Sequence, residues 1–80
     1  MHPIEINNVT IYGQSNCEPC NSAKALLKSK GIEFTYIELN SKEVIEEFTK
    51  KTNGARSIPQ IFINDIHVGN YVDLRKALGE

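Results

Sequence analysis

The chain has two cysteines, Cys17 and Cys20, and only two residues separate them. Loop-closure entropy makes a disulfide across so short a ring worth about 2 kcal/mol, against roughly 3 kcal/mol for a fifteen-residue loop. The pair is therefore a poor structural staple. In a chain without further cysteines this spacing is typical of redox catalysis or metal binding, so the fold is expected to present both sulfurs for chemistry.

A short strand followed by a helix is expected around the cysteines. β-Branched and aromatic residues predict a strand over Val9–Tyr12, and apolar residues at helical spacing predict a helix over Glu18–Lys30. Cys17 then lies at the helix start, where unpaired backbone N–H groups and the helix dipole stabilise a thiolate. Cys20 comes round the first turn, within reach of a mixed disulfide at Cys17. We therefore expect Cys17 to be the nucleophile and Cys20 the resolving thiol.

The two residues between the cysteines act in opposite directions. Pro19 fits the first turn of a helix, where its missing N–H has no cost, and it stiffens the ring. Glu18 places a negative charge beside the thiolate, which at about 6 Å is unfavourable by roughly 0.7 kcal/mol in water and more in a lower dielectric. Glu18 also fits a capping box with Ser15, and both interpretations of Glu18 stay open.

The remaining segments alternate between strand and helix patterns, with Gly31 ending the first helix. They comprise a strand over Ile32–Leu39, a helix capped by Asn40 or Ser41 and ended by Asn53-Gly54, a hairpin of Gln60–Ile63 and Ile66–Val68 around the turn residues Asn64-Asp65, and a helix begun by Asn70 with Asp73. The expected buried helix faces are formed by Ala23, Leu26 and Leu27, by Val44, Ile45 and Phe48, and by Leu74, Ala77 and Leu78. This β-α-β-α-β-β-α order predicts an α/β fold, a four-stranded mixed sheet flanked by three helices.

Length and charge limit the classes of partner. Eighty residues make one domain, residues 1–80, and a net charge of -1 gives no attraction to phosphate backbones. Nucleic acid is therefore not an expected partner. The chain has no basic start followed by an apolar run, and no apolar stretch long enough to cross a bilayer. We expect a cytoplasmic monomer that does not contact a membrane.

Metal binding is the main rival interpretation of the cysteine pair. Structural zinc takes four ligands, and the further nitrogen candidates are His2 and His67, at no recognised spacing from the cysteines. We interpret His67 as a polar strand residue and His2 as part of the terminus. No metal is therefore expected within one chain, although two chains sharing a metal or an iron-sulfur cluster stays an open alternative.

With these residues assembled, the chain resembles a glutaredoxin over nearly all of its length. Three groups of segments carry the resemblance: Val9–Tyr12 with Cys17-Glu18-Pro19-Cys20 and Ala23–Leu27, then Gly54–Ile63 with Ser57-Ile58-Pro59, and lastly His67-Val68-Gly69 with Asp73-Leu74. The resemblance implies a thioredoxin-like fold in which Pro59 is cis and faces the active-site sulfur. It also implies a dithiol enzyme that reduces protein disulfides and glutathione mixed disulfides with glutathione as co-substrate.

The same resemblance implies a set of glutathione contacts. Ile58 would offer its backbone to the cysteinyl part of glutathione. Arg56 would clamp a glutathione carboxylate with its guanidinium fork, or else is an exposed loop cation. The full set of implied contacts is Tyr12, Gln14, Arg56, Ser57, Ile58, Pro59, Gly69, Asn70 and Asp73.

This chain departs from the family pattern where glutathione would bind. Glu18-Pro19 replaces the usual Pro-Tyr, and Gln14 replaces a lysine often found before the first cysteine. Asn70 replaces the second glycine, and Tyr71-Val72 replaces a small residue followed by Asp, which leaves Asp73 one position late. Two alternatives therefore stay open beside a glutaredoxin: a glutathione-independent redoxin that donates electrons to an enzyme such as ribonucleotide reductase, and an iron-sulfur carrier.

Overall fold

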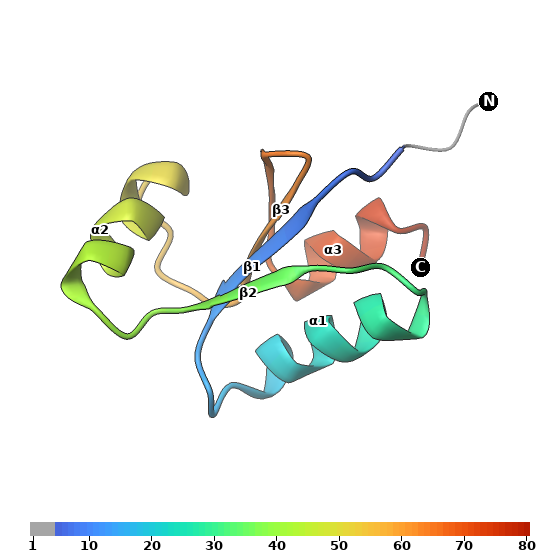
Figure 1. Cartoon of the computed structure of the whole chain (residues 1–80), viewed down its shortest axis with the longest axis horizontal. Coiled ribbons are helices and arrows are strands. Elements are labelled where there is room, and N and C mark those ends of the chain that lie inside the picture. Colours follow the sequence, from blue (N-terminus) through green and yellow to red (C-terminus); the bar gives the residue numbers. More distant parts are fainter. Residues whose placement is uncertain (1–4) are drawn as a thin grey trace.

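A computed structural model describes residues 5–80, so His2, interpreted above as part of the terminus, lies outside the described part of the chain. Strands and helices follow in the predicted order (Figure 1). They are β1 Val9–Gly13, α1 Glu18–Ser29, β2 Thr35–Glu38, α2 Lys42–Lys51, β3 Gln60–Ile63, β4 Ile66–Gly69 and α3 Tyr71–Ala77.

The four strands form one mixed sheet in the order β2-β1-β3-β4. β1 pairs with β2 in parallel, with Thr10 opposite Thr35, and with β3 in antiparallel fashion, with Thr10 opposite Phe62. β3 and β4 form the predicted hairpin. The first strand is therefore central, and the chain that leaves its end carries the cysteines. The predicted α/β class and mixed sheet are confirmed.

One face of the sheet packs against both α1 and α3, whose apolar side chains join one cluster with those of the strands. Helical spacing brings Ala23 and Leu27 onto the sheet, and Leu74 joins them from α3. Burying a leucine side chain contributes about 1.5–3 kcal/mol, so this cluster is the main source of stability. The cluster comprises Val9, Ile11, Ala23, Leu27, Ile61, Ile63 and Leu74.

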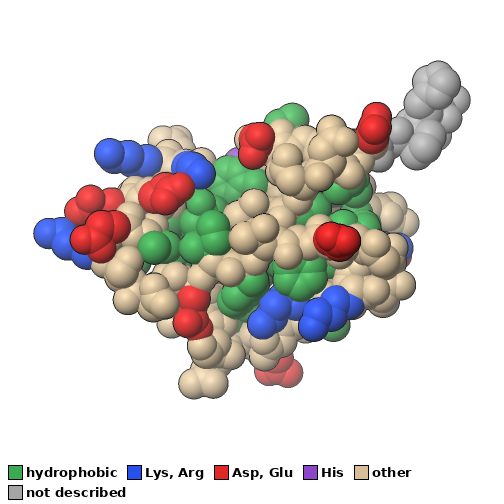
Figure 2. Space-filling model, in the orientation of Figure 1, with side chains coloured by type: hydrophobic (Ala, Val, Ile, Leu, Met, Phe, Trp, Pro, Cys, Tyr) green, Lys and Arg blue, Asp and Glu red, His purple; other side chains and the backbone are tan. Residues whose placement is uncertain are grey.

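The remaining helix, α2, packs beside one end of the sheet (Figure 1). Phe48 on α2 forms a second cluster with Tyr12 and Phe62, whose side chains alternate away from the first cluster. Because α2 reaches the sheet with only part of its apolar face, Ile45 is 46% exposed. The predicted buried face of this helix was therefore wrong at Ile45. Figure 2 shows apolar side chains interspersed with charged ones on the viewed surface.

Two further sequence predictions were wrong in detail. The strand predicted over Ile32–Leu39 is only Thr35–Glu38, because the N–H of Ile32 bonds to the carbonyl of Leu27 and so belongs to the end of α1. Gly31, at φ 70°, makes that turn possible. Ala77, predicted to be buried, is exposed, since only Leu74 of α3 reaches the core fully.

Within residues 5–80, no helix has the length and apolar character that crossing a membrane requires.

Candidate active site

Cys17 begins helix α1 and caps it with its own sulfur. Its backbone is extended, at φ -125° and ψ 108°, and its Sγ accepts a hydrogen bond from the N–H of Cys20 at 3.2 Å. The predicted position at the helix start is confirmed. The capping box of Ser15 and Glu18 was wrong, because Cys17 holds the cap position and the Ser15 hydroxyl instead donates to the Glu38 carboxylate.

The two cysteines differ in their access to solvent. They form a disulfide in the structure, with their Cα atoms 5.1 Å apart. Cys20 is fully buried, whereas Cys17 keeps 8% of its surface exposed. An incoming sulfur can therefore reach Cys17 first, while Cys20 is held one turn away at the distance that an internal exchange needs.

Gly13, at the end of β1, passes close to the buried sulfur. A Cβ placed on Gly13 would lie 2.7 Å from the Sγ of Cys20 and 2.5 Å from the hydroxyl oxygen of Tyr36. Only glycine therefore fits between the disulfide and this tyrosine. The sequence did not indicate Gly13 as a site residue. Its contacts with Cys20 and Tyr36 join three separate segments, and no local sequence pattern predicts them.

Tyr36 supports the loop that leads to Cys17. Its hydroxyl donates a hydrogen bond to the carbonyl of Gln14 at 2.7 Å, and Lys24 lies 4.1 Å from the centre of its ring. Burial raises the pKa of the Tyr36 hydroxyl above its ordinary value of 10.0, and the nearby Glu38 carboxylate adds to this increase. The hydroxyl therefore stays protonated, and able to donate, across the neutral range.

A groove of about 200 Å³ lies beside the cysteine turn. Pro19, between the cysteines, lines one part of it, and the Ile58–Pro59 segment with its cis peptide bond lines another. The cis bond agrees with what the resemblance implied. The complete lining is Pro19, Ser57, Ile58, Pro59, Asn70, Tyr71 and Val72, so the fold brings Ser57, Ile58, Pro59 and Asn70 together from the predicted contacts.

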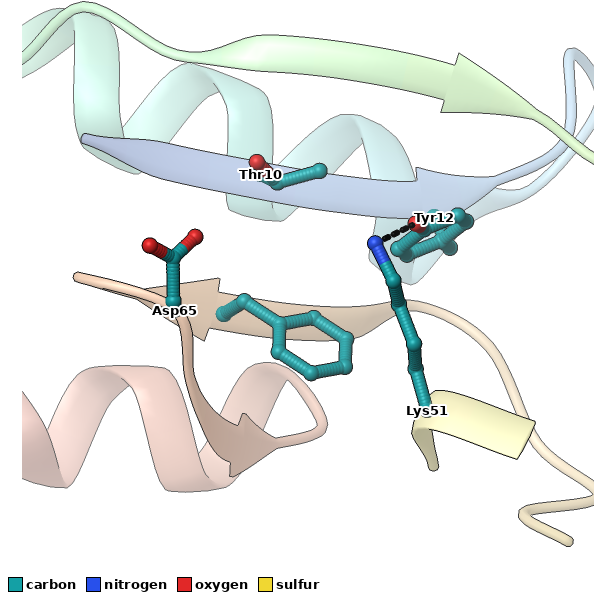
Figure 3. Close-up of a pocket in the computed structure, with 5 residues that line it drawn as sticks. Thr10, Tyr12, Lys51 and Asp65 are labelled. Atoms are coloured by element: carbon teal, nitrogen blue, oxygen red, sulfur yellow. Dashed lines mark hydrogen bonds between the residues drawn. The ribbon is translucent and has the colours of Figure 1, made fainter. Parts of the chain in front are cut away.

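The other five predicted contacts do not line that groove: Tyr12, Gln14 and Arg56, and also Gly69 and Asp73 at the start of α3. Tyr12 is buried edge-on against Phe48 and Phe62, and its hydroxyl accepts a hydrogen bond from Lys51 at 3.4 Å in a separate pocket that Thr10 and Asp65 also line (Figure 3). Arg56 and Gln14 are exposed residues of their loops.

Asp73 and Gly69 belong to the start of helix α3. The Asn70 side chain accepts from the N–H of Asp73, and the Asp73 carboxylate accepts from the N–H of Asn70, both at 3.0 Å. The helix start predicted at Asn70 with Asp73 is confirmed, and it is a capping box. Gly69, at φ 126°, lies directly against the Asp73 carboxylate, where a Cβ would clash. The Asp73 carboxylate is therefore held in the cap of α3 by its hydrogen bond from the N–H of Asn70.

A hydrogen-bonded pair that the sequence did not indicate connects β3 to β4. The Gln60 side chain is buried, and its amide contacts Ser57 on one side and the His67 ring on the other. His67 is an exposed strand residue, as interpreted from the sequence, and stacks on Phe62. Among residues 5–80, no cluster of three His, Cys, Asp or Glu side chains is suited to holding a metal ion.

Comparison with known proteins decides the family. The family model for glutaredoxin matches residues 9–68, which include both cysteines and the cis proline. The chain belongs to the glutaredoxin family. A probable glutaredoxin of Synechocystis is 45% identical over 67 residues, covering 82% of this chain and 76% of the relative, and glutaredoxin 3 of Escherichia coli is 40% identical over 67 residues, covering 84% and 81%.

The solution structure of a glutaredoxin from Brucella melitensis has a TM-score of 0.75 and 37% identity, covering 98% of this chain and 85% of that one. This match confirms the thioredoxin-like fold. With Cys17 and Cys20 forming its Cys-x-x-Cys pair, this glutaredoxin is a dithiol glutaredoxin and a thiol-disulfide oxidoreductase. Glutaredoxins use glutathione as reductant and act on disulfide substrates. The interpretation of this sequence as a dithiol glutaredoxin is confirmed.

Proposed function

We propose that this glutaredoxin takes its electrons from glutathione and reduces protein disulfides and glutathione mixed disulfides, with Cys17 as nucleophile. The observation that carries the proposal is the placement of Cys17. Its sulfur caps helix α1, Cys17 keeps 8% of its surface exposed while Cys20 is fully buried, and the nearby Pro19 lines the same groove as Ile58 and Pro59. A disulfide lying in that groove would present its sulfur to Cys17.

The exchange with a protein disulfide follows from this asymmetry. The Cys17 thiolate attacks one substrate sulfur, forms a mixed disulfide and releases the other substrate sulfur as a thiolate. The thiol of Cys20 then loses its proton and attacks the sulfur of Cys17. This second attack releases the remaining substrate thiolate and forms the Cys17–Cys20 disulfide present in the structure.

Two molecules of glutathione restore the dithiol. The first attacks Cys17, forms a glutathionyl adduct there and frees Cys20. The second attacks the sulfur of the bound glutathione, so oxidised glutathione leaves and the Cys17 thiolate is regenerated. For a glutathione mixed disulfide as substrate, the adduct forms directly on Cys17 and only this second step is needed.

The groove supplies the contacts for the glutathionyl group in this proposal. Ser57 and Ile58 offer backbone groups to its cysteinyl part, and Asn70 lies at the start of α3 on the same groove. Arg56 precedes these residues and is exposed, so its guanidinium is available to a carboxylate of glutathione.

Intact-mass measurement with oxidised glutathione tests the central step. Reduced protein is titrated with oxidised glutathione, alongside the Cys17→Ser and Cys20→Ser variants. We expect an adduct that accumulates in Cys20→Ser, is lost in Cys17→Ser and clears to an internal disulfide in the wild type. A Cys17 that stays unmodified while the pair still exchanges with protein disulfides contradicts the role of glutathione.

A second candidate has one observation in its favour. Among residues 5–80, those that line the groove carry no side chain charged at neutral pH, and the Asp73 carboxylate accepts a hydrogen bond from the N–H of Asn70 in the α3 cap. Such a groove suits an uncharged peptide segment better than the charged tripeptide. The alternative is a redoxin in a reducing compartment such as the cytoplasm, reduced by a thioredoxin reductase and serving ribonucleotide reductase. NADPH oxidation coupled to thioredoxin reductase, compared with glutathione and glutathione reductase, separates the two.

A further inference from the structure

A buried glutamine connects an exposed histidine to the loop beside the active site. Gln60 is the first residue of β3, directly after the cis Pro59, and only 5% of it is exposed. Its amide nitrogen donates to the carbonyl of Ser57 at 3.0 Å and to the Ser57 hydroxyl at 3.2 Å. Its amide oxygen lies 2.6 Å from Nε2 of His67.

The chemistry of these groups fixes the direction of each hydrogen bond. A backbone carbonyl can only accept, so the amide nitrogen of Gln60 must face Ser57. The amide oxygen then faces His67 and can also only accept. Nε2 of His67 must therefore carry a proton, which makes the neutral ring the Nε2–H tautomer.

The Ser57 carbonyl that Gln60 holds belongs to the peptide unit that leads into Ile58. A peptide unit is planar, and the cis bond in this loop is the following one, Ile58–Pro59. In a trans unit the N–H points opposite to the C=O, so fixing the carbonyl of Ser57 also fixes the direction of the N–H of Ile58. Both residues line the groove beside the cysteines.

We propose that His67 is a positioning residue, which through Gln60 holds the Ser57–Ile58 peptide in the orientation that substrate binding requires. Without a donor at His67, the buried amide oxygen of Gln60 loses its hydrogen-bond partner. Because an unsatisfied buried acceptor is unfavourable, the amide is expected to rotate and direct that oxygen toward another donor. Its hydrogen bonds to Ser57 would then be lost. The inference rests on the proposed function of the groove, and His67 itself does not touch the substrate.

Two substitutions separate the hydrogen bond from the ring. His67 stacks on Phe62 with ring centroids 5.0 Å apart, so His67→Phe keeps an aromatic ring there and removes the donor. His67→Gln removes the ring and keeps an N–H donor at a comparable reach from the backbone. Both variants are first compared by thermal unfolding, so that a loss of folding is recognised.

Steady-state reduction of a glutathionylated peptide, coupled to glutathione reductase and NADPH, gives the first readout. We expect His67→Phe to raise KM by roughly fivefold with kcat unchanged, since one hydrogen bond is lost. We expect His67→Gln to keep the wild-type KM. Equal behaviour of the two variants, or a raised KM in His67→Gln alone, overturns the proposal.

A second readout uses the reduced protein without any substrate. Nitrogen chemical shifts of the His67 ring are expected to show the Nε2–H tautomer, and the backbone amide shifts of Ser57 and Ile58 are expected to change in His67→Phe but not in His67→Gln. The proposal is overturned if the ring is the Nδ1–H tautomer, or if the amide shifts of Ser57 and Ile58 are unchanged in His67→Phe. A wild type that shows this pattern but does not turn over the glutathionylated peptide contradicts the proposed function and leaves the positioning intact.

Discussion

At the scale of single residues, Gly13 is the tightest position in the active site. Any Cβ there would lie 2.7 Å from Sγ of Cys20 and 2.5 Å from the Tyr36 hydroxyl. Since Cys20 is fully buried and cannot move aside, we expect Gly13→Ala to lower the free energy of unfolding of the oxidised protein by about 1–3 kcal/mol. Urea denaturation measures this loss.

The same measurement in a Tyr36→Phe background serves as the control. Phenylalanine lacks the oxygen that the new Cβ meets first, so the cost of Gly13→Ala should be smaller there by about 1 kcal/mol. An equal cost in both backgrounds would show that crowding against Tyr36 is not the cause.

Val72 is the second residue with a direct consequence. It lines the groove with 54% of its surface exposed, and none of the described residues that line the groove, Val72 included, carries a charge at neutral pH. Glutathione carries an ammonium group, so we expect Val72→Asp to lower KM for a glutathionylated peptide by roughly two- to fivefold, the range of one exposed ion pair. Because salt screens such a pair, the effect should shrink as ionic strength rises.

Val72→Asn is the matched control, since it is similar in size to aspartate and uncharged. It should leave KM, and the dependence of KM on salt, as they are in the wild type. A lower KM in both variants, or one that salt does not alter, would assign the change to shape or hydrogen bonding rather than to charge.

At the scale of elements, the start of α1 combines helix capping with sulfur chemistry. Glu18 is an exposed carboxylate in the first turn, where it stabilises the helix dipole but opposes a thiolate at Cys17. We expect Glu18→Gln to speed alkylation of Cys17 by iodoacetamide at neutral pH by roughly threefold, from a loss of about 0.7 kcal/mol of repulsion. The same change should reduce the free energy of unfolding by a few tenths of a kcal/mol.

Glu43 is the acidic residue in the first turn of α2, one position further from its cap than Glu18 is in α1, and so provides a matched control. Glu43→Gln should cost similar stability and leave the alkylation rate of Cys17 unchanged. If both substitutions speed alkylation equally, general loosening of the molecule explains the result better than local charge.

Local patterns predicted these elements because their signals lie within a few residues. The helix start at Cys17, the stop at Gly31 and the Asn70–Asp73 cap all depend on neighbours in the chain. What failed depended on distant contacts: α2 reaches only the end of the sheet, so Ile45 stayed exposed despite a correct helical pattern.

The active site shows the same division. The cysteine pair and the segment around Pro59 are visible as short motifs, and the fold brings them together around one groove. The roles of Tyr36 and Gln60 are not visible in a local motif, because they arise only when β2 lies beside β1 and β4 beside β3. Sequence patterns therefore predicted the sulfur chemistry, and the structure was needed for the groups that support it.

At the scale of the whole molecule, two apolar clusters on opposite faces of the sheet hold the fold together. Neither cluster needs the covalent bond between Cys17 and Cys20, which closes a ring too short to remove much entropy from the unfolded chain. We therefore expect reduction to change the free energy of unfolding by no more than about 2 kcal/mol, with the same far-ultraviolet circular dichroism.

Urea unfolding of the oxidised and reduced protein, with the Cys17→Ser/Cys20→Ser double variant as a permanently open control, measures this difference. A redox enzyme needs both forms to be folded, because the difference in their stabilities adds directly to the equilibrium with glutathione. An oxidised form more stable by several kcal/mol would bias the pair toward the disulfide and make it a structural staple. Near-equal stabilities would instead leave the bond free to open and close at every turnover.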